Sequence, residues 1–320
     1  MTETIDTRHL VDPELLPVIE ALPFREFDRE TLPLARAESA ERFRFLGEPP
    51  LAAEVKTIDG PAGPLDIYWY DPAPGTTGRA VLLHIHGGGM ILGTAKDMAF
   101  GPSGMAVALG IPVASVEYRL APEAPFPAPQ EDCLAALHWL ANEASALGID
   151  PARIAVIGES AGGGLAAATA QMARDIGGPR LAAQVLVYPM LDCRTGGDDC
   201  RWRNPATGEF VWTRASNQFG WGCLKGDYTA DDGDPRKGWF SPSLADDLTG
   251  LPPALILTGS LDLFFDEDLD YARRLVAAGV PVELHSYPGA IHGFNIVAEA
   301  KVAQAFTRDL LGGITRLLGL

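Results

Sequence analysis

The stretch RIAVIGESAGG, residues 153–163, decides the fold. Its apolar half predicts a strand that ends at Gly158, and the residues after Ser160 have the pattern of a helix. Because Gly158 and Gly162 are small, the chain can turn so tightly that the Ser160 hydroxyl is exposed from a strained backbone. The helix then points its free N–H groups at the same place, where they favour negative charge. A chance Gly-rich turn lacks this strand and helix, so the stretch predicts a nucleophile elbow with Ser160 as the catalytic serine.

Short β-rich runs alternate with longer helical segments on both sides of this turn. Such alternation predicts parallel βαβ units, and hence a mostly parallel sheet with helices on both faces. The nearly continuous apolar runs 80–86 and 153–158 are typical of central strands that are buried on both sides. The predicted strands are 65–70, 81–86, 113–118, 154–158, 185–188, 254–258 and 282–287, and the predicted helices are 129–147, 161–176, 266–278 and 299–318.

A second glycine-rich segment, His86-Gly87-Gly88-Gly89, follows another buried strand. Glycines leave backbone N–H groups unshielded, and such donors can stabilise the oxyanion of an acyl-transfer intermediate by ~3 kcal/mol each. A phosphate-binding loop is the alternative, but no Lys-Ser or Lys-Thr pair follows the glycines. We interpret the segment as an oxyanion loop in which His86 orders the chain rather than acting as a base.

The serine needs a base, and His292 is the candidate among six histidines. It lies in a loop after a predicted strand, and loops at the carboxyl ends of parallel strands converge where Ser160 is exposed. Asp262, shortly after the strand 254–258, is the predicted acid that orients His292. Asp266 is the alternative acid, although its position fits the first turn of a helix. Apart from His86, the other histidines lie in predicted strands, in a helix or in the N-terminal segment: His9, His84, His138 and His285.

Acidic residues outnumber basic ones, 42 to 25, which gives a formal net charge of −17. This charge repels phosphate backbones and anionic lipids, so neither nucleic acid nor a membrane is an expected partner. The N-terminus lacks a secretory pattern, and no segment has the ~18 apolar residues of a membrane span. The four cysteines form no C-x-x-C pair and are expected to be free thiols in the cytoplasm, although Cys193 and Cys200 could pair in an oxidising compartment.

Two segments contain none of the predicted strands. Residues 1–50 contain scattered Pro, Phe and Leu with helical spacing, and residues 192–234 are rich in Gly, Asp and Trp. We expect residues 1–50 to form the N-terminal part of a helical cap over a catalytic domain, residues 51–320. Residues 192–234 are expected to add a second contribution to this cap.

Together these motifs resemble the hormone-sensitive-lipase-like esterases, the bacterial family IV carboxylesterases. The resemblance rests on motifs that occur in the family order: His86-Gly-Gly-Gly, Tyr118-Arg-Leu-Ala-Pro-Glu, Gly158-Glu-Ser-Ala-Gly-Gly, the Asp262 segment and His292-Gly-Phe. It implies an α/β-hydrolase fold with about eight strands and an oxyanion hole made by Gly88, Gly89 and the N–H of Ala161, with Gly87 needed for the turn. It also implies no metal or organic cofactor and, in many members, a homodimer.

The chain departs from the family pattern at two positions. Glu159 precedes the serine where the family usually has Asp, and Leu263 follows Asp262 where the family usually has Pro. The first change alters the hydrogen bonds available beneath the elbow, and the second makes the loop of the acid less rigid. Neither change removes a catalytic group.

The motifs and the resemblance predict a carboxylesterase that acts on small ester molecules. An amidase or peptidase with the same triad is the alternative, and a non-catalytic receptor on the same fold is less favoured because His292 is present. Apolar residues spaced among acids and prolines suit a cap over a pocket of limited depth, so acyl chains of about four to eight carbons are expected. The candidate substrate-lining residues are aromatic cap residues and neighbours of the motifs: Phe24, Phe27, Met90, Glu159, Phe210, Trp212 and Leu263.

Overall fold

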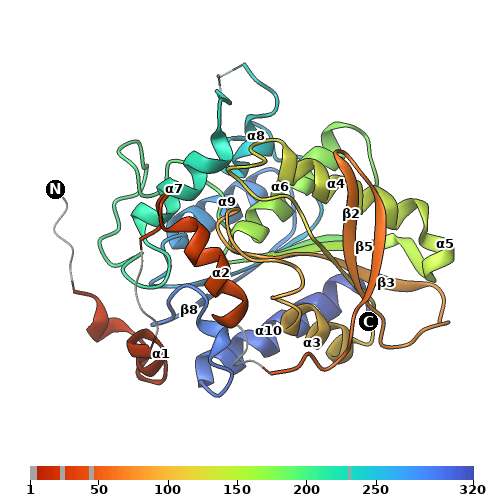
Figure 1. The fold of residues 1–320 in the computed structure, drawn as a ribbon, viewed down its shortest axis with the longest axis horizontal. Coiled ribbons are helices and arrows are strands. Elements are labelled where there is room, and N and C mark those ends of the chain that lie inside the picture. The colour runs from red at the N-terminus through yellow and green to blue at the C-terminus, as the bar shows by residue number, and fades with distance from the viewer. Residues whose placement is uncertain (1–5, 22–25, 43–46, 230, 232) are drawn as a thin grey trace.

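A computed structural model of the chain describes residues 6–21, 26–42, 47–229, 231 and 233–320. In these ranges the core is an eight-stranded sheet with the order β1-β2-β4-β3-β5-β6-β7-β8 (Figure 1). β2 pairs antiparallel with β1 and β4, and all the other pairs are parallel. The strands are β1 (Glu54–Gly60), β2 (Gly63–Tyr70), β3 (Arg79–Ile85), β4 (Val113–Val116), β5 (Ile149–Glu159), β6 (Ala183–Val187), β7 (Ala254–Gly259) and β8 (Val282–Tyr287).

Helices cover both faces of this sheet, and the alternating side chains of its central strands supply both apolar layers. In β3, Val81 and Leu83 belong to the cluster beneath α4, α6 and α9, whereas Leu82 belongs to the cluster beneath α3 and α10. Both faces are therefore buried, as the continuous apolar runs predict. The helices are α1 (Leu16–Ala21), α2 (Leu32–Arg42), α3 (Phe100–Leu109), α4 (Ala128–Asn142), α5 (Ala144–Leu147), α6 (Ala161–Asp175), α7 (Arg214–Lys225), α8 (Lys237–Phe240), α9 (Phe265–Ala277) and α10 (Lys301–Leu318).

The predicted α/β-hydrolase fold is confirmed, and each predicted strand and helix is present with ends that differ by a few residues. The predicted helix 129–147 is interrupted at Glu143, where α4 ends before α5 begins. β1 was not predicted because it is an edge strand that alternates between exposed and half-buried residues and lacks a continuous apolar run. α3 was not predicted because Gly and Pro interrupt its helical pattern.

The N-terminal segment contains only helical turns and helices in its described part, and it rests on the loops at one end of the sheet. Figure 1 shows α1, α2 and α7 on the same side of the molecule. The N–H of Thr7 donates to Glu209 Oε2 at 2.7 Å, and the N–H of Asp12 donates to the carbonyl of Gly289 at 3.0 Å. Leu15 is fully buried in the apolar cluster beneath α3 and α10. The segment is therefore packed into the fold beside the His292 loop.

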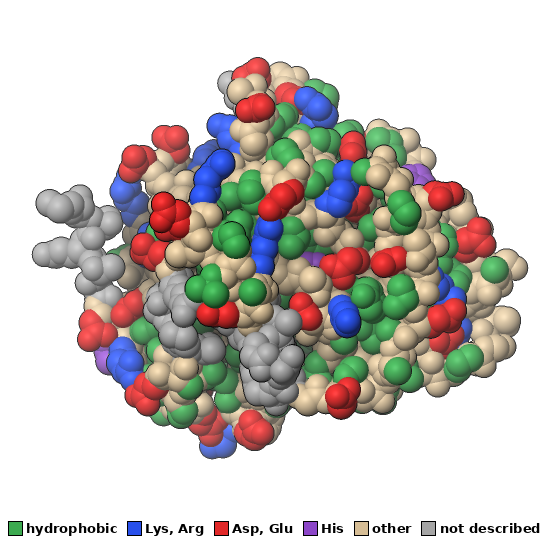
Figure 2. Space-filling view, viewed as in Figure 1, with side chains coloured by type: hydrophobic (Ala, Val, Ile, Leu, Met, Phe, Trp, Pro, Cys, Tyr) green, Lys and Arg blue, Asp and Glu red, His purple; other side chains and the backbone are tan. Residues whose placement is uncertain are grey.

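Charged side chains are spread over the visible face of the molecule, with acidic ones present in every part of it (Figure 2). This distribution agrees with the net charge of −17. No helix within the described ranges combines the length and the apolar character that a membrane crossing requires. All four cysteines are free thiols in the structure.

Candidate active site

Ser160 sits at the turn between β5 and α6 with a strained backbone, φ 58° and ψ −121°. A side-chain carbon at Gly158 would collide with the carbonyl of Gly162, and one at Gly162 would collide with the carbonyl of Ile85. The turn is therefore open only to glycine at both positions. The N–H of Ser160 donates to the carbonyl of Val187 at 2.9 Å, which ties the turn to the end of β6. The serine side chain is held at the carboxyl end of the sheet.

His292 and Asp262 lie beside this serine, in the loops after β8 and β7. His292 Nε2 is 2.9 Å from Ser160 Oγ, and His292 Nδ1 is 2.7 Å from Asp262 Oδ2. A carboxylate can only accept, so Nδ1 carries the proton and Nε2 is free to accept the serine proton. Asp262 Oδ1 also accepts from the N–H of Phe264 at 3.0 Å, which fixes the carboxylate plane. All three side chains are more than nine-tenths buried.

Two aromatic rings contact the imidazole of His292. The Tyr188 ring lies 4.8 Å from it and the Phe264 ring lies 5.3 Å from it, both edge-on. The Tyr188 hydroxyl donates to Asn295 Oδ1 at 2.8 Å, which anchors that ring to the loop after His292. These rings restrict the rotation of the imidazole, and no sequence motif pointed to either residue.

The acids after Asp262 occupy the start of α9 but have different surroundings. Asp266 lies in the first turn, as its helical position predicts. Glu267 and Asp268 are buried, so the helix dipole alone does not account for their positions. Glu267 accepts from the N–H of Leu191 at 2.7 Å and from the hydroxyl of Thr195. Burial raises the pKa of Glu267, and the carboxyl fastens α9 to the segment that follows β6.

The His86-Gly89 segment forms a tight loop directly after β3. Gly88 and Gly89 have φ of 114° and 63°, which favour glycine. A side-chain carbon at Gly88 would collide with the carbonyl of Leu92, and one at Gly87 would lie 2.9 Å from the carbonyl of Glu159. The loop therefore approaches the elbow closely. Ala161 begins α6, so its N–H is among the donors at the helix start that have no partner within the helix.

His86 is fully buried and orders this loop. Its Nδ1 donates to the carbonyl of Gly87 at 2.8 Å, and its ring stacks on Tyr118 with centroids 4.2 Å apart. The Tyr118 hydroxyl donates to the carbonyl of His86 at 2.8 Å. Burial lowers the pKa of His86 to about 3, so the ring is neutral near pH 7.

The structure brings two of the candidate substrate-lining residues, Phe27 and Trp212, together above the oxyanion loop. Their ring centroids are 5.7 Å apart, and a side-chain carbon at Gly89 would collide with the Trp212 ring. Trp212 Nε1 donates to Asn217 Oδ1 at 3.1 Å, so the indole is held by α7. Trp212 thus places a fixed aromatic ring against Gly89.

The remaining candidates have other surroundings. Met90 is buried in the apolar cluster beneath α4, α6 and α9, and Phe210 is buried in the cluster beneath α3 and α10. Glu159 accepts from His84 Nε2 at 3.0 Å, beneath the elbow. Leu263 is buried next to Asp262, and Phe24 lies outside the described residues.

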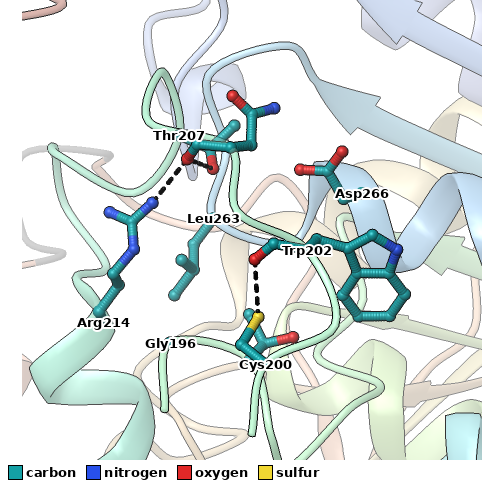
Figure 3. A pocket seen from close by; sticks show the side chains of 9 residues that line it. Gly196, Cys200, Trp202, Thr207, Arg214, Leu263 and Asp266 are labelled. Carbon is teal, nitrogen blue, oxygen red and sulfur yellow. Dashed lines mark hydrogen bonds between the residues drawn. The ribbon is translucent and has the colours of Figure 1, made fainter. Parts of the chain in front are cut away.

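Leu263 also lines a small cavity of about 20 Å³. The cavity is bounded by Arg214, Asp266 and the loop around Cys200 and Thr207 (Figure 3). Neither Ser160 nor His292 contributes to its lining. Ligand pockets usually enclose ~300 Å³ or more, so this cavity is too small for an ester substrate. Within the part of the chain that the structure describes, no three His, Cys, Asp or Glu side chains form a group that could hold a metal ion.

Glu117 directly precedes the Tyr118 motif and contacts Ala95, which follows the oxyanion loop in the chain. Its Oε2 accepts from the N–H of Ala95 at 2.9 Å, and burial raises its pKa to about 7. The folded chain therefore binds this proton more tightly than the unfolded chain, in which the pKa is near 4.5. The stability that Glu117 contributes is fully present below pH ~4.5 and is lost as the pH rises through 7.

Replacing Glu117 with Gln should remove this pH dependence. The quantity to measure is the Tm of the wild type minus the Tm of Glu117→Gln, by differential scanning calorimetry. This difference is expected to decrease as the pH rises from about 5 to about 8. Glu123→Gln is the control, because the ion pair with Arg36 lowers the pKa of Glu123 and keeps that carboxylate ionised across this range. If the Tm difference between the wild type and Glu117→Gln stays constant with pH, Glu117 does not have a raised pKa.

The fold and the Ser-His-Asp cluster at the ends of β5, β8 and β7 define the class of α/β hydrolases. A family model described as alpha/beta hydrolase fold matches residues 82–296. The chain is 35% identical to the esterase LipI of Mycobacterium tuberculosis, over 99% of this chain and 97% of that protein. It is 36% identical to an ethyl acetate hydrolase of Pseudomonas putida, over 77% of each chain.

A solved structure titled bacterial heroin esterase has a TM-score of 0.88 and 39% sequence identity, and the match covers 97% of this chain and 98% of that one. The chain therefore belongs to the α/β-hydrolase family, in its hormone-sensitive-lipase-like branch.

Proposed function

We propose that the chain is a carboxylesterase that hydrolyses short- to medium-chain esters through Ser160, His292 and Asp262. The single observation that carries the proposal is the continuous hydrogen-bonded chain from Asp262 Oδ2 through both ring nitrogens of His292 to Ser160 Oγ. A serine hydroxyl becomes a useful nucleophile when such a base removes its proton. The relatives named as esterases support the choice of esters over amides.

In the proposed reaction, Ser160 Oγ attacks the ester carbonyl carbon while its proton passes to His292 Nε2. Asp262 stabilises the imidazolium that forms. The C–O bond to the alcohol then breaks, and His292 returns the proton to the departing alcohol oxygen. Water repeats the cycle on the acyl-enzyme, giving up its proton to His292, and the carboxylic acid leaves as Ser160 regains a proton.

The oxyanion of each tetrahedral intermediate is proposed to accept from the N–H groups of Gly88, Gly89 and Ala161. The Gly87 position supports this because it brings the loop close to the elbow. Donors held in place before the reaction cost no reorganisation when the charge develops, and each can be worth ~3 kcal/mol.

We further propose that residues 1–50 and 192–234 together cap the catalytic domain, residues 51–320. Two contacts that join these segments support it: the Thr7 N–H with Glu209, and the Phe27 ring with Trp212. A cytoplasmic location, with free thiols kept reduced, and a homodimer are proposed on the sequence and family resemblance alone.

Acyl-chain preference tests the proposed substrate class. Because each buried methylene contributes up to ~0.8 kcal/mol, kcat/KM should climb by at most about fourfold per methylene until the pocket is full. With p-nitrophenyl esters we expect a maximum at about four to eight carbons and little activity on long-chain triglyceride emulsions.

Removing the first forty residues is expected to flatten this preference and lower activity. The deletion also uncovers core side chains such as Val11 and Leu15, so Trp212→Ala is the matched variant that keeps the chain intact. It should move the optimum to longer acyl chains. A wild-type maximum at sixteen carbons, or an unchanged profile in both variants, would exclude the cap from chain-length selection.

A further inference from the structure

Arg36, on the cap helix α2, contacts the catalytic domain at three places. Its Nε donates to the carbonyl of Ile91 at 2.8 Å, and its Nη2 donates to the carbonyl of Ala121 at 2.7 Å. The same guanidinium pairs with both carboxylate oxygens of Glu123, at 2.7 and 2.8 Å. Its partners are 55 to 87 residues away in the chain, so the contact is wholly tertiary. The Arg36 side chain thus joins α2 to the partly buried surface of the catalytic domain.

Arg36 contacts the chain two residues after the oxyanion loop, at the carbonyl of Ile91. The carbonyl of Gly88 accepts from the N–H groups of Ile91, at 3.1 Å, and Leu92, at 2.8 Å, and so closes the loop on its inner side. The N–H of Ala121 donates to the carbonyl of Met90 at 2.9 Å. Arg36 therefore binds the carbonyls of Ile91 and Ala121 at once, and Ala121 in turn binds Met90.

The chain just after the loop needs such support because Met90 has a strained backbone. Gly88, Gly89 and Met90 follow one another with φ of 114°, 63° and 63°, and Met90 is not a glycine. A non-glycine residue keeps this conformation only where surrounding contacts over-determine it. The planar guanidinium supplies charge-assisted hydrogen bonds in a fixed geometry, which Lys cannot reproduce.

The helix has a second attachment that does not involve Arg36. Leu32, at the start of α2, is buried in the same apolar cluster as Met90 and Ile91. Loss of the guanidinium should therefore leave α2 attached while releasing the loop carbonyls. This separates an effect on the loop from a loss of the cap.

We propose that Arg36 is a positioning residue that couples the docking of α2 to the geometry of the oxyanion loop. The loop then presents Gly88 and Gly89 to the oxyanion only when the cap helix is docked. The inference rests on the proposed esterase function and deepens it, because it makes the docking of α2 a condition for forming the oxyanion hole.

The experiment compares Arg36→Gln and Arg36→Lys with the wild type. It measures kcat and KM for p-nitrophenyl butyrate, the Ki of a short-chain trifluoromethyl ketone, and Tm. The ketone adduct with Ser160 carries an oxyanion, so its affinity reports the hole directly. We expect Arg36→Gln to lower kcat by about tenfold or more and to raise the ketone Ki by a similar factor, with KM changed less than about threefold. Arg36→Lys should show the same pattern with smaller changes.

Two controls separate the loop contacts from charge. Glu123→Gln removes the ion pair but leaves both carbonyl contacts of Arg36, and should change kcat by less than about threefold. Arg308→Gln removes an exposed guanidinium on α10 that pairs only with its neighbour Asp309 among the contacts of the described residues, and should match the wild type.

The outcomes are distinct. If Arg36→Gln raises KM while kcat and the ketone Ki stay at wild-type values, Arg36 only shapes the cap and the coupling is wrong. If that variant does not fold, a wild-type ketone Ki in Arg36→Lys overturns the coupling. A wild type that binds the ketone but hydrolyses no ester refutes the proposed function alone, and the Ki ratio still decides the coupling. A wild type that binds no ketone refutes both.

Discussion

Ser160→Ala is expected to reduce ester hydrolysis by about 10⁴-fold or more while the fold remains intact. The hydroxyl is the only group at the elbow that can form the acyl-enzyme in the proposed reaction. Its removal deletes one hydrogen bond, to His292 Nε2, and leaves the main-chain bonds of the turn unchanged. The measurement is kcat/KM with p-nitrophenyl butyrate, together with Tm and labelling by a fluorophosphonate, which reacts only with an activated serine.

Ser115→Ala is the matched control for this variant. Ser115 is also buried, and its Oγ lies 2.8 Å from a ring nitrogen of His84. Its removal should cost ~1–3 kcal/mol of stability because a buried ring nitrogen loses its partner. Labelling and turnover should stay within about tenfold of the wild type. Wild-type turnover by Ser160→Ala, or equal losses in both variants, would show that the nucleophile has been misassigned.

The strands of the core could be predicted from sequence because a parallel sheet that is buried on both faces requires continuous apolar runs. β3 and β5 have such runs and end at the two glycine motifs. β1 and α3 lack a local signal, since one is exposed and the other contains glycines and a proline. Their structure is decided by tertiary packing rather than by local pattern.

The candidate triad and oxyanion loop were predictable because the chemistry of each imposes a local pattern. An elbow needs glycines at fixed spacing around Ser160, and an oxyanion loop needs unshielded N–H groups. Arg36, Tyr188 and Phe264 have no such pattern. Their contacts join residues that are far apart in the chain. Only the folded structure therefore shows that Arg36 touches the carbonyl of Ile91 and that Tyr188 and Phe264 touch the ring of His292.

The acid has the weakest local pattern of the predicted triad members, because several acids follow β7. The sequence distinguishes Asp262 from Asp266 only through the expected start of a helix, and α9 does begin at Phe265. Burial does not discriminate, since Glu267 and Asp268 are buried as well. The distance of 2.7 Å from Asp262 Oδ2 to His292 Nδ1 is the observation that favours Asp262.

Asp262→Asn is therefore expected to lower kcat by about 10⁴-fold, while Asp266→Asn stays within about tenfold of the wild type. In the Asn variant, Oδ1 can still accept from the N–H of Phe264, as it does in the wild type. The amide NH₂ then faces His292 Nδ1 and can only donate to it, which forces the ring proton onto Nε2. A protonated Nε2 cannot accept from Ser160, so the imidazole is held in place in the wrong tautomer.

The two variants are matched because each replaces one carboxylate oxygen with NH₂ within a four-residue stretch. The assay is kcat on p-nitrophenyl butyrate, with Tm measured to show that both variants fold. A tautomer defect should also slow fluorophosphonate labelling in Asp262→Asn and leave KM nearly unchanged, because substrate binding does not need the base. Asp266→Asn should be labelled at the wild-type rate. A large loss in Asp266→Asn with a mild effect in Asp262→Asn would transfer the role of the acid to Asp266.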